Sequence, residues 1–582
     1  MRTKPRSAIR TVEWLHTFVA VTAGRDWDER AEDGKSRVAR AAYVAAAHPD
    51  LDASRAGDIE SNARQDKSLF ESLGLAYQER DSGIIRITPA GRELSSTDYP
   101  DEVMLRQLLK WQFPSYTHGD GAFARMNVFP FEVLLRVLER LVEVNRLEIA
   151  ATFFTCLSRD DIPSAIENIL AVRRMRKLTS EHVTTHAKRV IAELHPDLAR
   201  PSAASLLDMA DAFSRFAEYT GIVQSSGRSI YTKLSVPGRS HLKFGQLLSD
   251  YPFELRADTN DQAAFYEYFG DPSAVELPWD RAESLAEHVR RRAEALRQIA
   301  AERDAAAPQL ALKIDPNEVL QSVDDAEYAE LREWNRRLER GLIGAREQRF
   351  VEHEAKTPKM REEILAKFDD ILNGSEDDAA RWLEVNTWRS LVALDGDHTV
   401  ERNFKLEEDL TPRAFAPGAG NTPDMKYSSP RIVLIPEVSL QSGVRQWTNE
   451  GASVVDHVFR FINEHSDDAR PVIGLFIAPT LNERTAWQFF VLNQQSWRGE
   501  PVPVVPFEVD AWTDLLSHAY QRDLPARSVE ELIFHLHRAV LSSRNFKDWL
   551  RKMKLTIETW KADRLPTGDL SEPSQSALPL NF

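Results

Sequence analysis

Residues 423–440, PDMKYSSPRIVLIPEVSL, decide the fold of the C-terminal third of the chain. The apolar run Ile432–Leu440 predicts a buried strand, and Asp424–Tyr427 predicts the strand before it. Outward from this pair, helices and strands alternate, which predicts a mixed α/β domain with a buried central sheet. The other elements expected in this domain are a helix over Asp377–Leu394, a helix over about Gln446–Asn463, a strand over Val472–Ala478, a helical stretch near Trp487 and a strand over Val502–Phe507.

Two carboxylates interrupt these strands. Asp424 opens the first strand after Pro423, and Glu437 stands inside the second strand, followed by Val438 and Ser439. This order is the PD…(D/E)xK arrangement of metal-dependent nucleases, with Ser439 in the place of the lysine. Carboxylates at the ends of adjacent strands can share one hard cation such as Mg²⁺, which favours oxygen ligands. Taken alone, the spacing favours a pair of solvated strand-end carboxylates instead.

A polar stripe on the following helix strengthens the case for a shared site. Gln446, Glu450 and His457 fall within roughly 40° of one another on a regular helix. Glu450 is a candidate proton acceptor in place of the missing lysine. His457 is a candidate for holding a phosphate or shuttling a proton, although a lone histidine is more often an ordinary surface or core residue.

An internal repeat marks the N-terminal half. Residues 74–92 and 221–239 each begin with a glycine, and each has a second glycine 17 residues later that is followed by arginine. Each stretch is predicted to form a two-stranded hairpin, preceded by a helix over Asp58–Leu73 or Ala203–Tyr219. A helix followed by a hairpin is how a winged helix-turn-helix ends. The matched spacing favours tandem winged helices over two unrelated hairpins with solvated arginines.

Polar and basic side chains stud this repeat, as DNA contact would require. In a winged helix the last helix enters the major groove, and the wing lies along the backbone. The predicted DNA-binding residues are Arg64, Gln65 and Lys67 on the first helix, Arg86 and Arg92 on the first hairpin, and Arg228, Lys233 and Arg239 on the second.

The composition bounds the class of protein. The net charge of −16 argues at first sight against a nucleic-acid partner, but a DNA-binding face needs only local positive charge. No apolar run is long enough to predict a membrane span, and no signal peptide is expected. A single cysteine, Cys156, gives no internal disulfide and no cysteine-rich zinc site. A cytoplasmic protein is therefore expected.

The chain of 582 residues is predicted to be multidomain. The expected fold class is a mainly α N-terminal half with tandem winged-helix subdomains, a helical linker and an α/β nuclease domain of the PD-(D/E)XK type. The expected segments are a first winged-helix subdomain over 1–100, a helical and second winged-helix subdomain over 101–275, a helical linker over 276–375, the nuclease domain over 376–563 and a disordered tail over 564–582.

The C-terminal motifs resemble the catalytic region of the AlwI family of type IIS restriction endonucleases, which includes strand-specific nicking enzymes. The residues that carry this resemblance are Pro423-Asp424, Glu437-Val438-Ser439, Arg445-Gln446, Glu450 and His457, together with the segments 382–390, 108–114 and 129–131. The resemblance covers most of the chain thinly and the nuclease core densely.

Carried over residue by residue, the resemblance implies a magnesium site and its supporting groups. The implied metal ligands are Asp424, Glu437 and the main-chain carbonyl of Val438. The implied catalytic support comes from Glu450 and His457, with Glu384 as the acidic residue of the first nuclease helix. Because serine replaces the lysine, the general base stays open, and Lys426 is a second candidate for the missing positive charge.

The sequence therefore predicts a type IIS-like restriction endonuclease that binds a short asymmetric site in double-stranded DNA and hydrolyses a phosphodiester bond a few base pairs away. Cutting one strand needs one nuclease domain, whereas cutting both needs a transient dimer or a second subunit. The alternative is a non-catalytic tandem winged-helix DNA-binding regulator. A third reading is a nuclease of another class, such as a repair enzyme without a fixed site.

Overall fold

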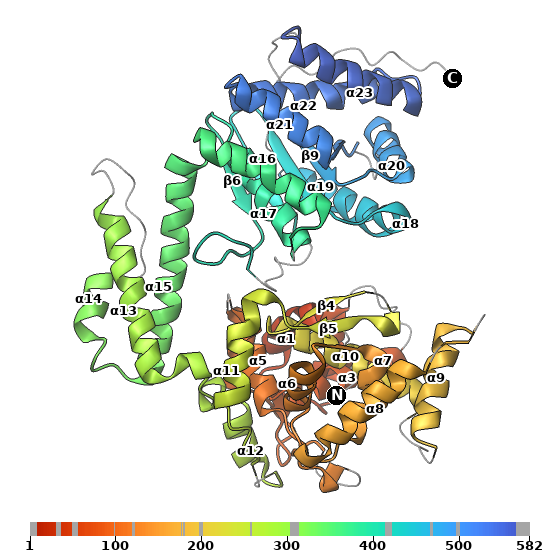
Figure 1. Ribbon diagram of the computed structural model, residues 1–582, viewed down its shortest axis with the longest axis vertical. Helices are drawn as coiled ribbons and strands as arrows, with labels where there is room; N and C mark the ends of the chain where they lie inside the picture. Colours follow the sequence, from red (N-terminus) through yellow and green to blue (C-terminus); the bar gives the residue numbers. More distant parts are fainter. Residues whose placement is uncertain are drawn as a thin grey trace. The chain divides into compact units, whose positions relative to one another are not determined.

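The computed structural model describes most of the chain (Figure 1). The described residues are 8–30, 37–48, 56–97, 99–118, 123–175, 177–178, 181–196, 202–227, 229–256, 259–302, 314–376, 378–413, 422–465, 470–495 and 501–565. The tail expected over 564–582 lies almost wholly outside these ranges, and so does Arg228. For Arg239 the backbone is described but not the side chain.

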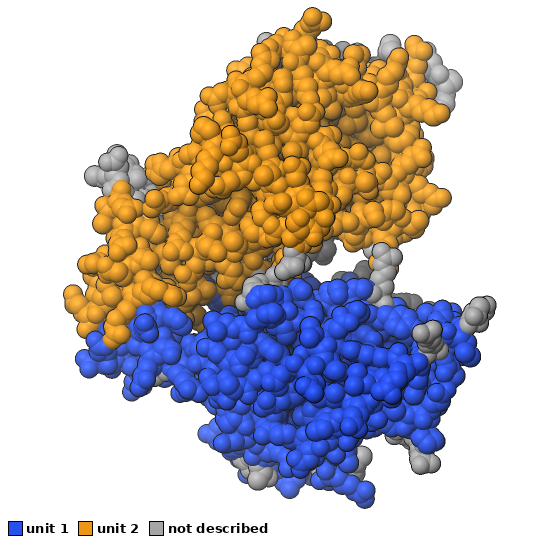
Figure 2. Space-filling view, viewed as in Figure 1, with its two compact units in different colours: residues 1–289, 322–333, 414–416 blue, residues 290–321, 334–413, 417–582 orange. Residues whose placement is uncertain are grey.

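The chain divides into two compact units (Figure 2). Unit 1 comprises residues 1–289, 322–333 and 414–416, and unit 2 comprises residues 290–321, 334–413 and 417–582. The boundary falls within α13 (Ala282–Ala301), α14 (Pro316–Ser322) and α15 (Tyr328–Arg349). The finer division into five segments stays a prediction.

Unit 1 is mainly helical, with short strands between its helices. Its helices are α1 (Ala8–Thr22), α2 (Val38–Ala47), α3 (Ala56–Ser72), α4 (Pro89–Ser96), α5 (Pro100–Lys110), α6 (Pro130–Leu141), α7 (Arg146–Thr152), α8 (Ile162–Arg174), α9 (Val183–Leu194), α10 (Ala203–Tyr219), α11 (His241–Asp250) and α12 (Gln262–Phe269). Its strands are β1 (Ala76–Gln78), β2 (Ile85–Ile87), β3 (Glu143–Asn145), β4 (Gln224–Ser226) and β5 (Lys233–Ser235).

An aromatic cluster joins the first three helices of unit 1. The ring of Phe18 on α1 lies 5.2 Å from Tyr43 on α2, 5.0 Å from Phe70 on α3 and 5.6 Å from Trp27. All four side chains are fully buried. Large aromatic side chains contribute much of the buried apolar area of a core, so this cluster sets how α3 sits beside α1 and α2.

The two helix–hairpin copies predicted from the repeat are present. β1 pairs with β2, and β4 pairs with β5, both antiparallel. Two residues after each preceding helix lies a glycine, Gly74 (φ 70°) or Gly221 (φ 71°), in the left-handed conformation that favours glycine. Three residues before each glycine, Glu71 and Glu218 accept a hydrogen bond, each at 3.1 Å, from the backbone N–H seven residues further along. The copies therefore share their turns as well as their order of elements.

The second copy has a strand that the sequence did not predict. β3 pairs with β5, so the second hairpin is part of a three-stranded sheet in the order β3-β5-β4. β3 lies between α6 and α7, in the part of 101–275 that was expected to be helical ahead of the second winged helix. A three-residue strand is too short to show a period of two, which is why the pattern missed it.

Unit 2 holds a five-stranded mixed sheet in the order β10-β9-β8-β7-β6. The strands are β6 (Thr399–Arg402), β7 (Met425–Ser428), β8 (Val433–Val438), β9 (Val472–Ala478) and β10 (Val504–Glu508). β8, β9 and β10 are parallel, whereas β7 runs antiparallel to both β6 and β8. The helices of this unit are α16 (Pro358–Asn373), α17 (Ala379–Val392), α18 (Gly443–Arg445), α19 (Gly451–Glu464), α20 (Glu483–Gln494), α21 (Val509–Gln521), α22 (Ala526–Leu541) and α23 (Phe546–Lys561).

Each face of the sheet has its own apolar core. On one face, Val433 and Ile435 of β8 cluster with Val454 and Val458 of α19. On the other face, Leu434 of β8 belongs to the cluster that includes α17. Alternate residues of a strand point to opposite faces, so the parity of a residue on β7 or β8 decides which helix it meets.

The sequence predicted most elements of unit 2 within a few residues. The strand expected over Val472–Ala478 is confirmed with the same bounds. The strand expected over 432–440 is shorter, as β8, and β6 was not predicted. Within the part of the chain that the structure describes, no helix combines the length and apolarity needed to cross a membrane.

Candidate active site

The sheet brings the two predicted strand carboxylates to one place. Glu437 has the same parity as Val433, which packs on the α19 side of the sheet. Ser428 pairs with Val433 in the β7–β8 register, so Asp424, which has the same parity as Ser428, faces that side too. One oxygen of Asp424, Oδ2, accepts a hydrogen bond of 2.9 Å from the backbone N–H of Val438. The two carboxylates therefore meet where β7 begins and β8 ends.

Glu437 is deeply buried at this end of the sheet. Its side chain is 9% exposed, and its Oε1 lies 2.6 Å from Nδ1 of His457 on α19. Burial, followed by the charge of Glu450, raises the pKa of Glu437 to about 8, and hydrogen bonds with Asp424 act in the opposite direction. A carboxyl group with this pKa keeps a proton near neutral pH unless a cation compensates its charge.

Asp424 and Glu384 extend the cluster. Burial, followed by the charge of Glu437, raises the pKa of Asp424 well above its ordinary value, although part of its surface still reaches water. Glu384, on α17, has its pKa raised to about 8 by burial and then by the charge of Asp424. The acid predicted on the first nuclease helix therefore lies near the strand carboxylates.

Glu450 approaches the same cluster from the segment before α19. Burial raises its pKa, while a hydrogen bond with the Ser439 hydroxyl lowers it. Gln441 donates a hydrogen bond of 2.5 Å from its side-chain amide to Oε1 of Glu450. Ser439 stands in the place of the nuclease lysine, so the Glu450 carboxylate lies beside the position that a lysine would fill.

Gln446 does not share the face that the sequence assigned to it. Residues 446–450 form a π-helical turn between α18 and α19, which changes the phase of the stripe. Gln446 is fully buried, donates to the carbonyls of Gln441 and Thr480, both at 2.8 Å, and accepts from the backbone N–H of Asn482 at 2.7 Å. It ties the loop after β8 to the loop after β9 and does not point into the cluster.

Within the described residues, no arginine or lysine forms an ion pair with Asp424, Glu437 or Glu450. His457 is the cluster's nitrogen contact, and burial lowers its pKa, which favours the neutral imidazole. Neighbouring buried carboxyl groups cannot all be ionised unless a cation compensates their charge; without one, some of them keep a proton.

The donor set suits a hard cation. Carboxylate and carbonyl oxygens are the ligands that Mg²⁺ prefers. Continuing the β7–β8 register places Pro423 opposite Val438, and proline has no N–H to donate to the Val438 carbonyl. In the described ranges, no three His, Cys, Asp or Glu side chains form a complete metal-binding group. A metal at Asp424 and Glu437 would therefore need a main-chain or water oxygen beside the two carboxylates, and the Val438 carbonyl is a candidate.

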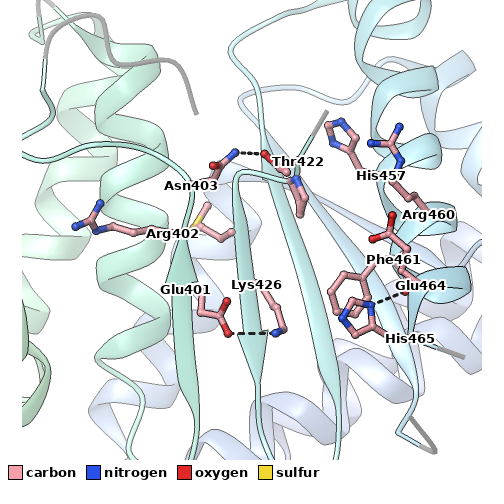
Figure 3. A pocket seen from close by; sticks show the side chains of 12 residues that line it. Glu401, Arg402, Asn403, Thr422, Lys426, His457, Arg460, Phe461, Glu464 and His465 are labelled. Carbon is pink, nitrogen blue, oxygen red and sulfur yellow. Dashed lines mark hydrogen bonds and ion pairs between the residues drawn. The ribbon is translucent and has the colours of Figure 1, made fainter. Parts of the chain in front are cut away.

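A pocket of about 450 Å³ borders the cluster (Figure 3). Pro423, directly before Asp424, and His457, in contact with Glu437, are both part of its lining. Lys426 also lines the pocket, and its Nζ lies 3.1 Å from Oε1 of Glu401 on β6. The positive charge of Lys426 is therefore directed at the pocket and at Glu401.

The predicted DNA-binding residues of the first copy lie on α3, on its hairpin and on α4. Arg64 is exposed on α3, while Gln65 donates to the Ser61 hydroxyl at 2.8 Å. Lys67 is largely buried and forms an ion pair of 2.8 Å with Glu71. It also donates a hydrogen bond of 3.1 Å to Oε1 of Gln78 on β1, so its ammonium joins the helix to the hairpin.

The basic residues of the hairpins also have partners within unit 1. Arg86 forms an ion pair of 2.9 Å with Glu79. Arg92, which was predicted on the first hairpin, lies on α4 instead and donates to the Ile87 carbonyl at 2.6 Å. Lys233, on β5, forms an ion pair of 2.7 Å with Glu143 on β3. Arg86 and Lys233 are about half exposed, so both remain accessible to a ligand.

Several buried acids that converge at one end of an α/β sheet indicate an enzyme, because a module that only binds DNA does not need them. A family model described as AlwI restriction endonuclease matches residues 71–515, which include the whole carboxylate cluster. The chain belongs to the AlwI restriction endonuclease family and is a site-specific DNA endonuclease. The family that the sequence motifs resemble is thereby confirmed.

Comparison with solved structures gave distant likenesses. The small subunit of the heterodimeric restriction endonuclease R.BspD6I is 18% identical over 34% of this chain and 98% of its own, with a TM-score of 0.29. Restriction endonuclease FokI is 11% identical, with a TM-score of 0.25, and the match covers 91% of this chain and 98% of the FokI chain. FokI bound to DNA is also 11% identical, with a TM-score of 0.22, and the match covers 91% of this chain and 92% of that chain. No curated protein sequence matches this chain.

Proposed function

We propose that this restriction endonuclease works in the type IIS manner. It binds a short asymmetric duplex site through residues 1–275 and hydrolyses a phosphodiester bond a few base pairs away through residues 376–563. The observation that supports this proposal is that the candidate DNA-binding elements and the carboxylate cluster lie in different units. Unit 1 contains both helix–hairpin copies, and unit 2 contains the carboxylate cluster. Reading and cutting by different units gives a cut outside the site that is read.

The cluster is proposed as a Mg²⁺ site held by Asp424, Glu437 and the carbonyl of Val438. A Mg²⁺ ion there would neutralise charge on the scissile phosphate and lower the pKa of a bound water. His457 holds the Glu437 carboxylate through the 2.6 Å contact, so it fixes the orientation of one ligand. Glu384 adds negative charge beside Asp424 and favours cation binding.

Glu450 is proposed as the group that accepts the proton of the attacking water. It lies beside Ser439, in the lysine's place, and its raised pKa brings it closer to the range in which a base is effective at neutral pH. Gln441 and Ser439 hold its carboxylate from two sides. Because Glu450 and the metal ligands lie on different elements, proton transfer and metal binding can be tested separately.

The helix–hairpin copies are proposed as winged-helix modules that read and grip the duplex. The exposed Arg64 and its neighbour Gln65 would reach base edges from α3, as residues of a recognition helix do. Arg86 and Lys233 would contact phosphates from the two hairpins, and Arg92 would add to them. Arg228 and Arg239 belong to the same set by their place in the repeat.

The experiment that tests this function is plasmid cleavage with Mg²⁺, followed by mapping of the ends. Discrete ends at one fixed offset from one short motif are expected, and chelation with EDTA should abolish them. Scattered ends would overturn the type IIS assignment in favour of a nuclease without a fixed site. Cleavage that persists in EDTA would overturn the metal site.

The same assay separates nicking from double-strand cleavage. The described residues of one chain hold one carboxylate cluster, so one chain is expected to cut one strand. Linear product that rises with the square of enzyme concentration would indicate a transient dimer. A nicked circle as the end product would indicate a nicking enzyme or a missing second subunit.

A further inference from the structure

The pocket beside the carboxylate cluster lies between strands and a helix (Figure 3). Glu401 and Lys426 come from β6 and β7 on one side, and His457, Arg460, Phe461 and His465 come from α19 and its end on the other. Its volume of about 450 Å³ falls within the roughly 300–1,000 Å³ of ligand pockets. A group the size of a nucleotide therefore fits it.

The pocket and the cluster share a border on two sides. On the strand side, Thr422 and Pro423 line the pocket directly before Asp424. On the helix side, His457 lines the pocket while its Nδ1 contacts Glu437. A DNA strand whose phosphate lies at the carboxylates can therefore continue past this border and bring its next sugar and phosphate to the pocket.

The lining of the pocket suits a sugar–phosphate unit. Lys426 and Arg460 supply positive charge. Lys426 pairs with Glu401, whose side chain is 66% exposed, and its Nζ lies 5.7 Å from the ring centroid of Phe461. An ion pair with an exposed acid is weak, so a phosphate can replace Glu401 at little cost. The rings of Phe461 and His465 are stacked, with their centroids 3.9 Å apart and their planes 11° from parallel. This stack gives the helix side of the pocket a flat surface against which a deoxyribose can pack.

We propose that this pocket binds the nucleotide next to the scissile phosphate on the strand being cut, with Lys426 and Arg460 as ligands of its phosphate. The inference rests on the proposed function, in which the cut falls outside the site that is read. A nuclease of that kind must hold the cut site through groups that every nucleotide shares, and phosphate contacts position DNA without reading sequence. Lys426 thus acts on a neighbouring phosphate and does not replace the nuclease lysine inside the cluster.

The test uses the full-length enzyme and duplexes in which one phosphate at a time, on either side of the mapped cut, is replaced by an uncharged methylphosphonate. Wild-type cleavage should slow at one flanking position. Lys426→Ala should slow cleavage of the unmodified duplex on the order of 10- to 100-fold, the usual worth of a charge-assisted contact. The same variant should become insensitive to the methylphosphonate at that position. Lys426→Arg should restore most of the rate.

Controls separate the two proposals. Lys554→Ala, exposed on α23 and outside the pocket lining, should keep both the wild-type rate and the sensitivity. Arg460→Ala should have the same effect as Lys426→Ala. Arg460 is exposed on α19, so this variant tests the pocket from the helix side. If wild-type cuts at a fixed offset but both variants keep full sensitivity to every methylphosphonate, the pocket assignment is wrong and the proposed function stands. If wild-type gives no fixed offset, both fall.

Discussion

In unit 1 the guanidinium of Arg106 is buried beside two acids, whereas in unit 2 the carboxylate of Asp424 is enclosed among other acids. Arg106 contacts Glu102 at 3.1 Å and also pairs with Asp280, so its charge is compensated where it lies. Burial and neighbouring acids instead raise the pKa of Asp424. A buried charge that stabilises a fold is paired with an opposite charge of the same chain. A buried charge that serves catalysis has no such partner, so a ligand can supply the opposite charge.

The strongest test of this comparison removes one metal ligand. Asp424→Asn should abolish cleavage, with a loss well beyond the roughly 10- to 100-fold typical of groups that only support a ligand. DNA binding, measured by fluorescence anisotropy with a cognate duplex, should stay unchanged because unit 1 is untouched. The control is Asp510→Asn, an exposed acid at the start of α21, which should cut normally. Near wild-type cleavage by Asp424→Asn would show that the metal site was misassigned.

A second test separates proton transfer from ligand positioning. Glu450→Gln should slow single-turnover cleavage on the order of 10²–10⁴-fold, and added Mg²⁺ should not restore it. His457→Ala should cost less and should recover at high Mg²⁺, because it removes the contact that holds Glu437. Equal and small losses in both variants would mean that these side chains are structural.

A third test breaks the compensated charge in unit 1. Arg106→Ala leaves Asp280 buried without its partner, so it should destabilise the protein by about 3–5 kcal/mol in urea unfolding. Arg215→Ala is the matched control, since Arg215 is 45% exposed and its partner Asp211 keeps a second ion pair with Arg146. It should cost no more than about 1 kcal/mol. A similar small loss in both variants would contradict the structural role of the Arg106 pair.

The uncompensated cluster should respond to pH in the opposite sense to a stabilising ion pair. Glu437 has a pKa of about 8 in the folded chain and an ordinary one in the unfolded chain. Stability is therefore complete below about pH 4.5 and is lost as pH rises towards 8, because folding then holds a proton that the unfolded chain releases. Glu437→Gln copies the protonated form, so its Tm in EDTA should exceed that of wild-type at pH 8 and equal it near pH 4.5. A constant difference across pH would exclude this origin.

The sequence predicted the members of the cluster better than their contacts. Asp424 and Glu437 were foreseen because a polar residue in an apolar strand is a local signal. The contact between His457 and Glu437 was not foreseen, because it depends on how α19 packs on the sheet. Gln446 was placed on the wrong face because a π-helical turn, which spacing alone does not reveal, shifts the residues before α19.

The sequence also located the helix–hairpin repeat but not the state of its charges. Paired glycines mark the ends of the helices because a left-handed residue is needed there, and this need is local. The partners of Lys67 and Lys233 come from the hairpin and from β3, so the sequence pattern could not show that these cations are already paired. Their use in DNA binding stays a prediction.

The smallest expected effect concerns an exposed pair that belongs to neither kind of buried charge. Arg86 and Glu79 lie 2.9 Å apart at the surface of the first hairpin, so Arg86→Ala should leave the Tm unchanged. If Arg86 contacts a phosphate, the variant should bind all duplexes more weakly, and the slope of log affinity against log salt should fall by about one. Lys233→Ala should do the same if the second hairpin also lies along the backbone. Arg140→Ala, exposed on α6, is the control and should change neither quantity. A reduced slope for one hairpin alone would show that the two copies have diverged in use, and no change for either would remove both from the DNA interface.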